Sequence, residues 1–337
     1  MVKATLSVLA TDAAQATLRL SDSSLPLANG ILRAAMADVE TVGFDGAQDS
    51  GLMVIKNEGA LHNPMTLDRI GEVPIHMTAA ETDAHRREMY VFEIHAKCAK
   101  DATGLLDVTS RDFRVFDADG KDLGQALAHR FFPVDPVTKG AILITQLRRG
   151  EELHVKGHSV KASGRKRASF CPVSRCSLVH SDAEGTTQKK GEDAKDEPTD
   201  FTITLRSECA LTPKEIVVRA LMSLRARVTG AAAAVDAGVS GDVTDAPKIV
   251  AIKFDTGATL HEVRFLTGED STLGELLQLH LLRVVPAFAG YDIPHNLDEL
   301  LVVRFDAMGK DPATVFADAC KGAIAEIGAT LAAVGKA

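Results

Sequence analysis

The sequence lacks tryptophan and is poor in aromatic residues of every kind. Aromatic residues make up 4% of its 337 residues, whereas hydrophobic residues as a whole make up 45%. Single-stranded nucleic acid binds on exposed aromatic rings that stack on its bases. The shortage of rings argues against such a surface, while the aliphatic content is enough for a sizeable core. At this length we expect about two domains.

Signals for disulfides, secretion and membranes are also missing. The five cysteines include no C-x-x-C pair, and the start of the chain, MVKATLSVLATDAAQ, lacks the apolar core of a secretory signal. No hydrophobic run approaches the ~18 residues that span a bilayer. We therefore expect an intracellular protein in a reducing compartment, with no membrane partner.

No motif of a common enzyme class occurs. The sequence contains no G-x-x-x-x-G-K-[ST] loop, no G-x-G-x-x-G strand–helix unit, no H-E-x-x-H motif and no G-x-S-x-G elbow. The carboxylates of DADGKD (117–122) fit a turn between strands, because a calcium loop spreads its ligands over roughly twelve residues. Cys171 and Cys176 have no second pair nearby to complete a metal site. We predict no catalytic residue, no cofactor and no metal.

The chain is acidic, with a formal net charge of −8. Phosphate affinity comes from clustered lysine and arginine, so non-specific DNA binding by the whole surface is not expected. One segment (158–170) is locally basic and concentrates Lys161, Arg165, Lys166 and Arg167. Two interpretations stay open for it: a solvated loop, or a basic surface for an acidic protein partner or upstream DNA.

Hydrophobic periodicity predicts two similar units at the ends of the chain. Near the start, alternating strands precede a helix that Ser24 caps. Near the end, two strands precede a helix for which Thr272 and Glu275 form a capping box, and one more strand leads into a long terminal helix. Each unit has more apolar helix surface than its small sheet covers, so we predict that the two short helices pack on each other as a pseudo-twofold pair. The predicted core of this contact is Leu27, Ile31, Leu273, Leu276, Leu277 and Leu281.

The region between the two units has a different character. From about Ile75 to Cys176 the sequence alternates or carries β-branched residues, which favours strands. Residues 181–200 are charged and aperiodic, which indicates a loop. A helix begins at Pro213, and the small, glycine-rich residues 231–247 predict a linker, with extension of the helix through its alanines as the alternative.

The C-terminal unit resembles a known family. DSTLGELLQLHLLRVVPAFAGYDIPHNLDELLVVRF (270–305) is similar to the small L-type subunit of archaeal and eukaryotic RNA polymerases, which has an acidic-x-Thr-Leu-Gly-x-Leu-Leu start, a Phe-Ala-Gly-Tyr turn and a Pro-His-Pro-Leu stretch. Asn296 stands where that family usually has proline. The matching residues are Thr272, Leu273, Gly274, Leu276, Leu277, Phe288, Ala289, Gly290, Tyr291, Pro294, His295 and Leu297.

The N-terminal part resembles the larger D-type partner of that subunit, which is equivalent to the N-terminal domain of the bacterial alpha subunit. Two stretches carry the similarity, PLANGILRAAMADVETVGFD (26–45) and NEGALHNPMTLDRIGEVPI (57–75). Leu32 and Glu40 replace an arginine and a proline of the family pattern. The matching residues are Leu27, Ala28, Asn29, Arg33, Val39, Thr41, Asn57, Leu61, Arg69, Gly71, Pro74 and Ile75.

The two types are normally separate proteins, and their fusion in one chain resembles the D/L-like subunit of large DNA viruses. The resemblance implies an α+β fold, namely the intramolecular alpha-like (D/L) dimerisation fold with an inserted mainly-β domain. The implied boundaries are a D-like domain at 1–76 and 200–230, the inserted domain at 77–199 with its acidic loop at 181–200, a linker at 231–247, and an L-like domain at 248–337.

The resemblance also implies a function. It is that of a non-catalytic assembly platform of a DNA-directed RNA polymerase, which docks two large catalytic subunits and small zinc-bearing subunits and reaches DNA only indirectly. By analogy with matching family positions, Arg33, Asn57, Arg69 and Pro74 are candidate contacts with the large subunits, and ordinary packing within the domain is the alternative for each. The implied location is a viral factory in the cytoplasm or the virion, with the nucleus as an alternative. Two other functions stay open, a free-standing α+β ligand-binding protein and a transcription regulator built on the same dimer.

Overall fold

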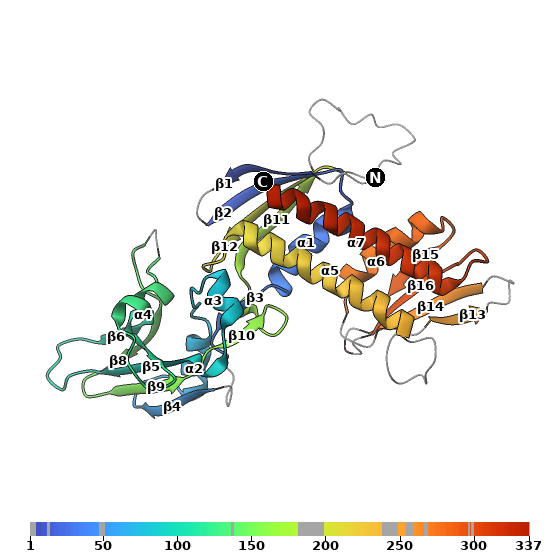
Figure 1. The fold of residues 1–337 in the computed structure, drawn as a ribbon. Coiled ribbons are helices and arrows are strands. Elements are labelled where there is room, and N and C mark those ends of the chain that lie inside the picture. The colour runs from blue at the N-terminus through green and yellow to red at the C-terminus, as the bar shows by residue number, and fades with distance from the viewer. Residues whose placement is uncertain are drawn as a thin grey trace, which may run out of the picture. The chain divides into compact units, whose positions relative to one another are not determined.

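The computed structural model describes residues 5–11, 14–46, 51–135, 138–180, 199–237, 249–253, 259–265, 269–295, 297 and 300–336. The chain divides into two compact units, whose elements are labelled in Figure 1. Unit 1 comprises Met1–Met36, Arg175–Arg206 and Pro213–Ala337, and unit 2 comprises Ala37–Ser174 and Ser207–Thr212. The predicted acidic loop up to residue 198 and the predicted linker from residue 238 to its end at residue 247 lie outside the described residues.

The N-terminal half of unit 1 is a four-stranded sheet with two helices. Strands β2 and β12 pair antiparallel and alternate buried with less buried residues, so that Leu18 and Leu20 of β2 lie opposite Ile203 and Phe201 of β12 on one covered face. The sheet order is β1-β2-β12-β11. The elements are β1 (Thr5–Thr11), β2 (Gln15–Ser21), α1 (Leu25–Ala37), β11 (Val173–His180), β12 (Phe201–Ser207) and α5 (Pro213–Ala237).

The C-terminal half of unit 1 repeats this plan with an antiparallel sheet of order β13-β14-β16-β15 and two helices. Val263 and Phe265 of β14 pair with Val303 and Leu301 of β16, and all four side chains are buried. The elements are β13 (Ile249–Lys253), β14 (Thr259–Phe265), α6 (Ser271–Val284), β15 (Ala289–Asp292), β16 (Leu301–Phe305) and α7 (Pro312–Lys336).

One predicted feature of this half was wrong. The Phe-Ala-Gly-Tyr stretch was expected to be a turn and the half to have three strands, whereas residues 289–292 form the edge strand β15. The backbone there is extended because it pairs with β16, with Gly290 opposite Arg304 and Tyr291 opposite Val303. The extended conformation depends on pairing with a strand that lies ten residues further along the chain. Gly290 by itself does not indicate a strand.

Unit 2 is built mainly from short strands. Its largest sheet has the order β4-β9-β5-β7, and two ribbons pair β10 with β3 and β6 with β8. The strands are β3 (Glu40–Gly43), β4 (Leu52–Asn57), β5 (Tyr90–Lys97), β6 (Leu106–Thr109), β7 (Phe113–Asp117), β8 (Leu143–Leu147), β9 (Glu152–Gly157) and β10 (Val160–Ser163). The helices are α2 (Asn63–Gly71), α3 (Ala79–Ala84) and α4 (Gln125–Phe131), with single 3-10 turns at Arg87–Met89, Ser110–Asp112 and Ala168–Phe170.

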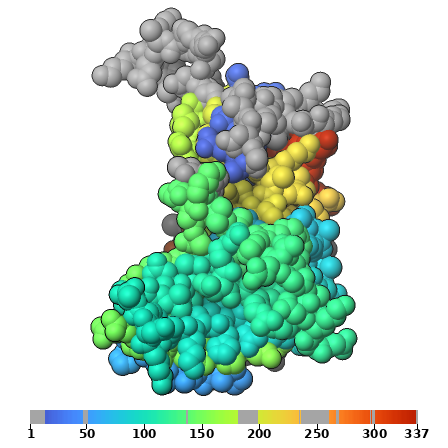
Figure 2. Space-filling model, turned by 90° about the vertical axis from the view of Figure 1, so that its left-hand side faces the viewer, coloured from blue at the N-terminus to red at the C-terminus, as the bar shows by residue number. Residues whose placement is uncertain are grey.

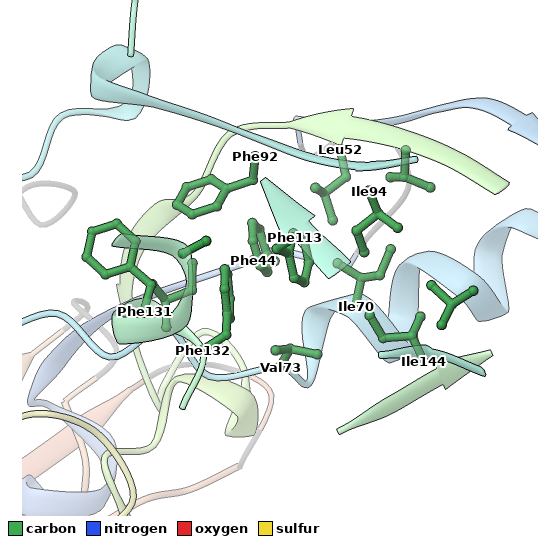
Figure 3. Packing of buried hydrophobic residues seen from close by; sticks show 14 of the residues in the cluster. Phe44, Leu52, Ile70, Val73, Phe92, Ile94, Phe113, Phe131, Phe132 and Ile144 are labelled. Carbon is green, nitrogen blue, oxygen red and sulfur yellow. The ribbon is translucent and has the colours of Figure 1, made fainter. Parts of the chain in front are cut away.

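The core of unit 2 gathers phenylalanines that lie far apart in the sequence, as Figure 3 shows. Phe44 stacks on Phe113 with ring centroids 5.2 Å apart, and its ring meets Phe92 edge-on at 5.1 Å. Phe113 stacks in turn on Phe132 at 4.4 Å. Such ring pairs add roughly 0.5–1.5 kcal/mol each beyond the area they bury.

This core explains where unit 2 begins. The inserted domain was expected to start at residue 77, whereas the compact unit starts at Ala37. The strands and helix of residues 40–71 supply Phe44, Leu52 and Ile70 to the same core as Phe92 and Phe113, so they cannot belong to another unit. Figure 2 shows the blue surface of β4 next to the yellow-green surface of β9, the two strands that pair across this range.

Candidate functional site

The six aliphatic residues predicted to form the helix contact all lie in the interior of unit 1. Each is 0–2% exposed. However, the two long helices α5 and α7 form the most extensive helix pair between the halves and run side by side in Figure 1. Only the two short helices were predicted to pair, and the apolar stripes of the long helices were not matched to each other. Buried residues of these stripes are Val217, Leu221, Leu224 and Val228 of α5, and Phe316, Cys320 and Ile327 of α7.

The short helices α1 and α6 meet where α1 has a glycine. A Cβ at Gly30 would lie 3.4 Å from both the Leu224 side chain of α5 and the Thr272 side chain of α6. A methyl group at Gly30 would therefore touch helices of both halves at van der Waals distance.

Gly274 of α6 has an even tighter neighbour. The ring of Tyr291 from β15 packs on it, and a Cβ at Gly274 would lie 2.6 Å from that ring. The Tyr291 hydroxyl donates to Glu275 Oε1 at 2.9 Å. The glycine at the start of α6 and the tyrosine of the following edge strand are thus parts of one packing arrangement.

A buried carboxylate joins the two halves. Glu326 of α7 is 1% exposed and accepts a hydrogen bond from the backbone N–H of Ser24, just before α1, at 2.9 Å. Arg283 of α6 donates to its other oxygen at 2.9 Å, and His280 Nε2 lies 3.0 Å from that oxygen but not in line for a regular hydrogen bond. We name Ser24, His280, Arg283 and Glu326 the Glu326 cluster. Burial alone raises the pKa of Glu326, but its hydrogen-bond partners outweigh burial and lower the pKa to about 2.

A second polar contact joins α5 to the start of α6. Arg227 is mostly buried and donates to Glu269 at 2.7 Å and to Asp270 at 2.8 Å. Burial lowers the pKa of Arg227, but the two carboxylates outweigh this and raise it. Asp270 is also the N-cap of α6, since its side chain accepts from the Thr272 N–H at 3.0 Å. The predicted cap at Thr272 was therefore wrong by two residues. Asp270, whose side chain also accepts a hydrogen bond from Arg227, caps the helix instead.

An open groove of about 320 Å³ runs between α1 and α6. Leu25 at one wall is 37% exposed and Leu282 at the other is 36% exposed. Thr272, Glu275 and Leu279 line α6 at spacings of three and four residues, so they share one helix face. The groove thus offers a partly apolar surface to which both halves contribute.

The four residues predicted to contact large subunits lie in both units. In unit 1, Arg33 lines the groove, and its guanidinium is 3.7 Å from Asp270. In unit 2, Asn57 donates to the carbonyl of Leu61 at 2.8 Å, and Arg69 donates to the carbonyl of Ile144 at 2.8 Å. Pro74 lines a smaller pocket of unit 2. Asn57 and Arg69 therefore have roles within their own unit.

Each basic side chain of the segment 161–167 has an acidic partner within unit 2. Lys161 lies 3.2 Å from Glu40, Arg165 2.5 Å from Asp38 and Lys166 2.7 Å from Asp45. Arg167 pairs with both Asp68 and Glu72. These pairs tie the segment to residues 38–72, which supports a structural role for its charges.

Three features are absent from the described part of the chain. No group of His, Cys, Asp and Glu side chains there is arranged to hold a metal ion. The five cysteines, all of which lie in the described part, form no disulfide. Within the same residues no helix has the length and apolar character needed to cross a bilayer.

The fold and the junction define a class of protein: an α+β unit in which two sheet-and-helix halves pair through their helices. Residues 264–332, from the end of β14 through most of α7, match the family model described as the RNA polymerase Rpb3/Rpb11 dimerisation domain. The chain is also similar to two proteins of Arabidopsis thaliana. It is 26% identical over 178 residues to the DNA-directed RNA polymerases II, IV and V subunit 3, and 27% identical over 179 residues to the DNA-directed RNA polymerases IV and V subunit 3B.

Each of these similarities covers 49% of this chain and 53% of the relative, so the chain spans about half the length of the relatives it matches. Together with the family match they support an RNA polymerase alpha-like subunit.

Proposed function

We propose that this chain is a non-catalytic assembly platform of a multisubunit DNA-directed RNA polymerase. Its N-terminal half acts as the D-like partner and its C-terminal half as the L-like partner of an intramolecular dimer, and unit 2 is a mainly-β domain inserted into the D-like partner. The observation that carries the proposal is the pairing of the two halves within unit 1, where one half matches a dimerisation domain.

Fusion of the partners gives the platform a physical advantage. Two halves on one chain meet at an effective concentration in about the millimolar range or above when the connecting segment spans them. The D-like and L-like surfaces then pair with each other before either meets a competing surface. A fused chain of this kind is the arrangement of large DNA viruses, and a viral source is part of the proposal. It predicts that the same genome encodes the two large subunits and no separate L-type subunit.

The groove between α1 and α6 is the proposed docking place for a large catalytic subunit. Both halves build it, so it exists only when they are paired. Leu25 and Leu282 supply exposed apolar surface there, while Arg33 supplies a charge. Partly exposed leucines beside a charged side chain are typical of the buried centre and polar rim of protein interfaces.

Substitutions in and near the groove test this. Leu282→Asp is expected to leave unfolding unchanged, because the side chain is already 36% exposed, and to lower recovery of the large subunits about tenfold. Met222→Asp on α5, at a side chain 58% exposed and outside the groove, is the matched control and should bind normally. Leu277→Asp, at a side chain 0% exposed, should prevent folding or assembly altogether. Normal recovery of large subunits with Leu282→Asp would contradict the docking place.

A free-standing ligand-binding protein and a transcription regulator on the same dimer are the rival functions. Neither requires stable association with the large catalytic subunits, so co-purification from the native source separates them from the platform.

A further inference from the structure

Unit 2 exposes three cations that its own carboxylates do not neutralise. Lys100, Arg148 and Arg149 are exposed, and within the described part of the chain none of the three forms an ion pair. In contrast, each basic side chain of the segment 161–167 has an acidic partner in the same unit. The positive charges at positions 100, 148 and 149 therefore remain available to a partner molecule.

The three cations lie at one end of the antiparallel pair of β5 and β9. The Gly150 N–H donates to the Cys98 carbonyl at 3.0 Å, and the Cys98 N–H donates to the Glu151 carbonyl at 2.9 Å. A Cβ at Gly150 would lie 3.6 Å from the Cγ atom of Lys100. Backbone hydrogen bonds thus join the turn that carries both arginines to the segment that carries the lysine.

Exposed leucines lie beside these cations. Leu106 of β6 pairs with Leu147, the last residue of β8, and Arg148 follows directly. Leu105 is 57% exposed and Leu106 is 37% exposed. Aliphatic surface and positive charge therefore meet in one place. We name this surface the Lys100 patch, which comprises Lys100, Leu105, Leu106, Arg148 and Arg149.

The carboxylates nearest to the Lys100 patch in sequence leave it positive. Glu151 Oε2 accepts from the backbone N–H of Arg148 at 2.7 Å, and Asp107 Oδ1 accepts from the Gln146 amide at 2.8 Å. Asp101 is exposed and offsets at most one of the three positive charges. The patch is thus locally basic on a chain whose formal net charge is −8.

We propose that the Lys100 patch binds an acidic segment of a partner protein in which carboxylates alternate with apolar side chains. The carboxylates pair with the three cations, and the apolar side chains pack on Leu105 and Leu106. A single strand of nucleic acid is disfavoured, because the patch has no aromatic ring on which a base can stack. The proposal holds whether or not the chain serves a polymerase.

The full-length chain and three labelled peptides test it. The probe is fluorescein-DDLDDFLDDL-amide. One control peptide has asparagine in place of every aspartate, and the other has serine in place of leucine and phenylalanine. Fluorescence anisotropy measures binding. We expect saturable binding of the probe that weakens as salt is added, and at least about tenfold weaker binding of either control peptide.

Substitution of the cations locates the site. The combined variant Lys100→Gln, Arg148→Gln and Arg149→Gln should bind the probe at least about tenfold more weakly. Arg149→Gln alone should weaken binding about threefold, and it covers the case in which the combined variant does not fold. The matched control removes the same charge from exposed positions of unit 2 outside the patch and should bind as the native chain does: Lys121→Gln, Lys139→Gln and Lys156→Gln.

Substitution of a leucine tests the apolar part. Leu105→Ser should weaken binding at least about threefold, because part of its side chain is buried by the partner. Met65→Ser, at a side chain of α2 that is 54% exposed and outside the patch, should not change binding.

A single-stranded oligothymidine of about 20 nucleotides should not displace the probe. Absence of saturable binding, equal affinity for the asparagine peptide, unchanged affinity in the cation variants, or displacement by the oligothymidine would each overturn the proposal. None of these outcomes bears on association with polymerase subunits.

Discussion

At the scale of single residues, Glu326 and its donors come from three separate segments of unit 1. The pKa of Glu326 is about 2 in the fold, against an ordinary value of 4.5. Its ionised form is thus favoured by folding, so the stability it adds is complete above about pH 4.5 and is lost as the pH falls toward about 2. The size of this contribution is on the order of 3 kcal/mol.

Glu326→Gln tests this contribution by urea unfolding at a series of pH values. The native chain should exceed the variant in free energy of unfolding at pH 6, and the difference should shrink as the pH approaches 2. A difference that does not change with pH would show that the charge of Glu326 adds nothing at the junction.

Gly274 and Gly30 give a matched pair of substitutions. Gly274→Ala places a methyl group against the Tyr291 ring and should destabilise the fold by about 1–3 kcal/mol. Gly30→Ala meets its neighbours at an ordinary 3.4 Å and should be neutral or stabilise by up to about 1 kcal/mol. Thermal unfolding compares the two. The loss at Gly274 should shrink in a Tyr291→Ala background, and an unchanged loss would argue against the ring contact.

Residue roles were predictable only where they are local. Ser24 was predicted as a cap from its position before the helix, and its Oγ accepts from the Leu27 N–H at 3.3 Å. Its bond to Glu326 joins residues 302 apart in sequence, and no local pattern marks such a partner. Gly274 was likewise named as a family match, but the Tyr291 ring that packs on it belongs to a strand that was expected to be a turn.

At the scale of elements, the ion pairs of residues 161–166 join β10 and the segment after it to residues 38–45, and those of Arg167 extend to Asp68 of α2 and to Glu72 just after it. Arg167 is the strongest of these links, since its guanidinium is 24% exposed and pairs with two carboxylates. Arg167→Gln should lower the stability of this region by roughly 1 kcal/mol, and less at high salt. Amide hydrogen exchange in β3 and β10 measures this. Lys321→Gln, which breaks an exposed pair on α7, should have almost no effect. Unchanged exchange in Arg167→Gln would contradict a structural role for the segment.

Elements with strong periodicity were predicted well. A long terminal helix was expected and is present as α7, and the helix expected from Pro213 begins there as α5. Which helices pack on each other was harder to predict from sequence. Several helices have apolar stripes of similar hydrophobicity, and the shapes of their surfaces decide which of them pair. For this reason α1 and α6 were paired in the sequence analysis, while α5 and α7 form the larger contact.

At the scale of the whole molecule, two halves of similar plan occupy one compact unit, and the two segments of unit 2 interrupt the N-terminal half in sequence. Their junction combines buried aliphatic stripes with two polar clusters. Buried polar groups need specific partners, so another packing of the two halves would cost the free energy of leaving these groups unpaired. In the proposed function, this junction gives the platform its fixed geometry. The similarity to polymerase subunits over half of the chain gives that platform a proposed task.

Affinity purification of the tagged full-length chain from its native source, followed by mass spectrometry, tests this task most directly. The platform predicts that the two large catalytic subunits of an RNA polymerase are recovered with it in equal amounts and stay bound through size-exclusion chromatography. Elution of the intact, folded chain without them would contradict the central claim.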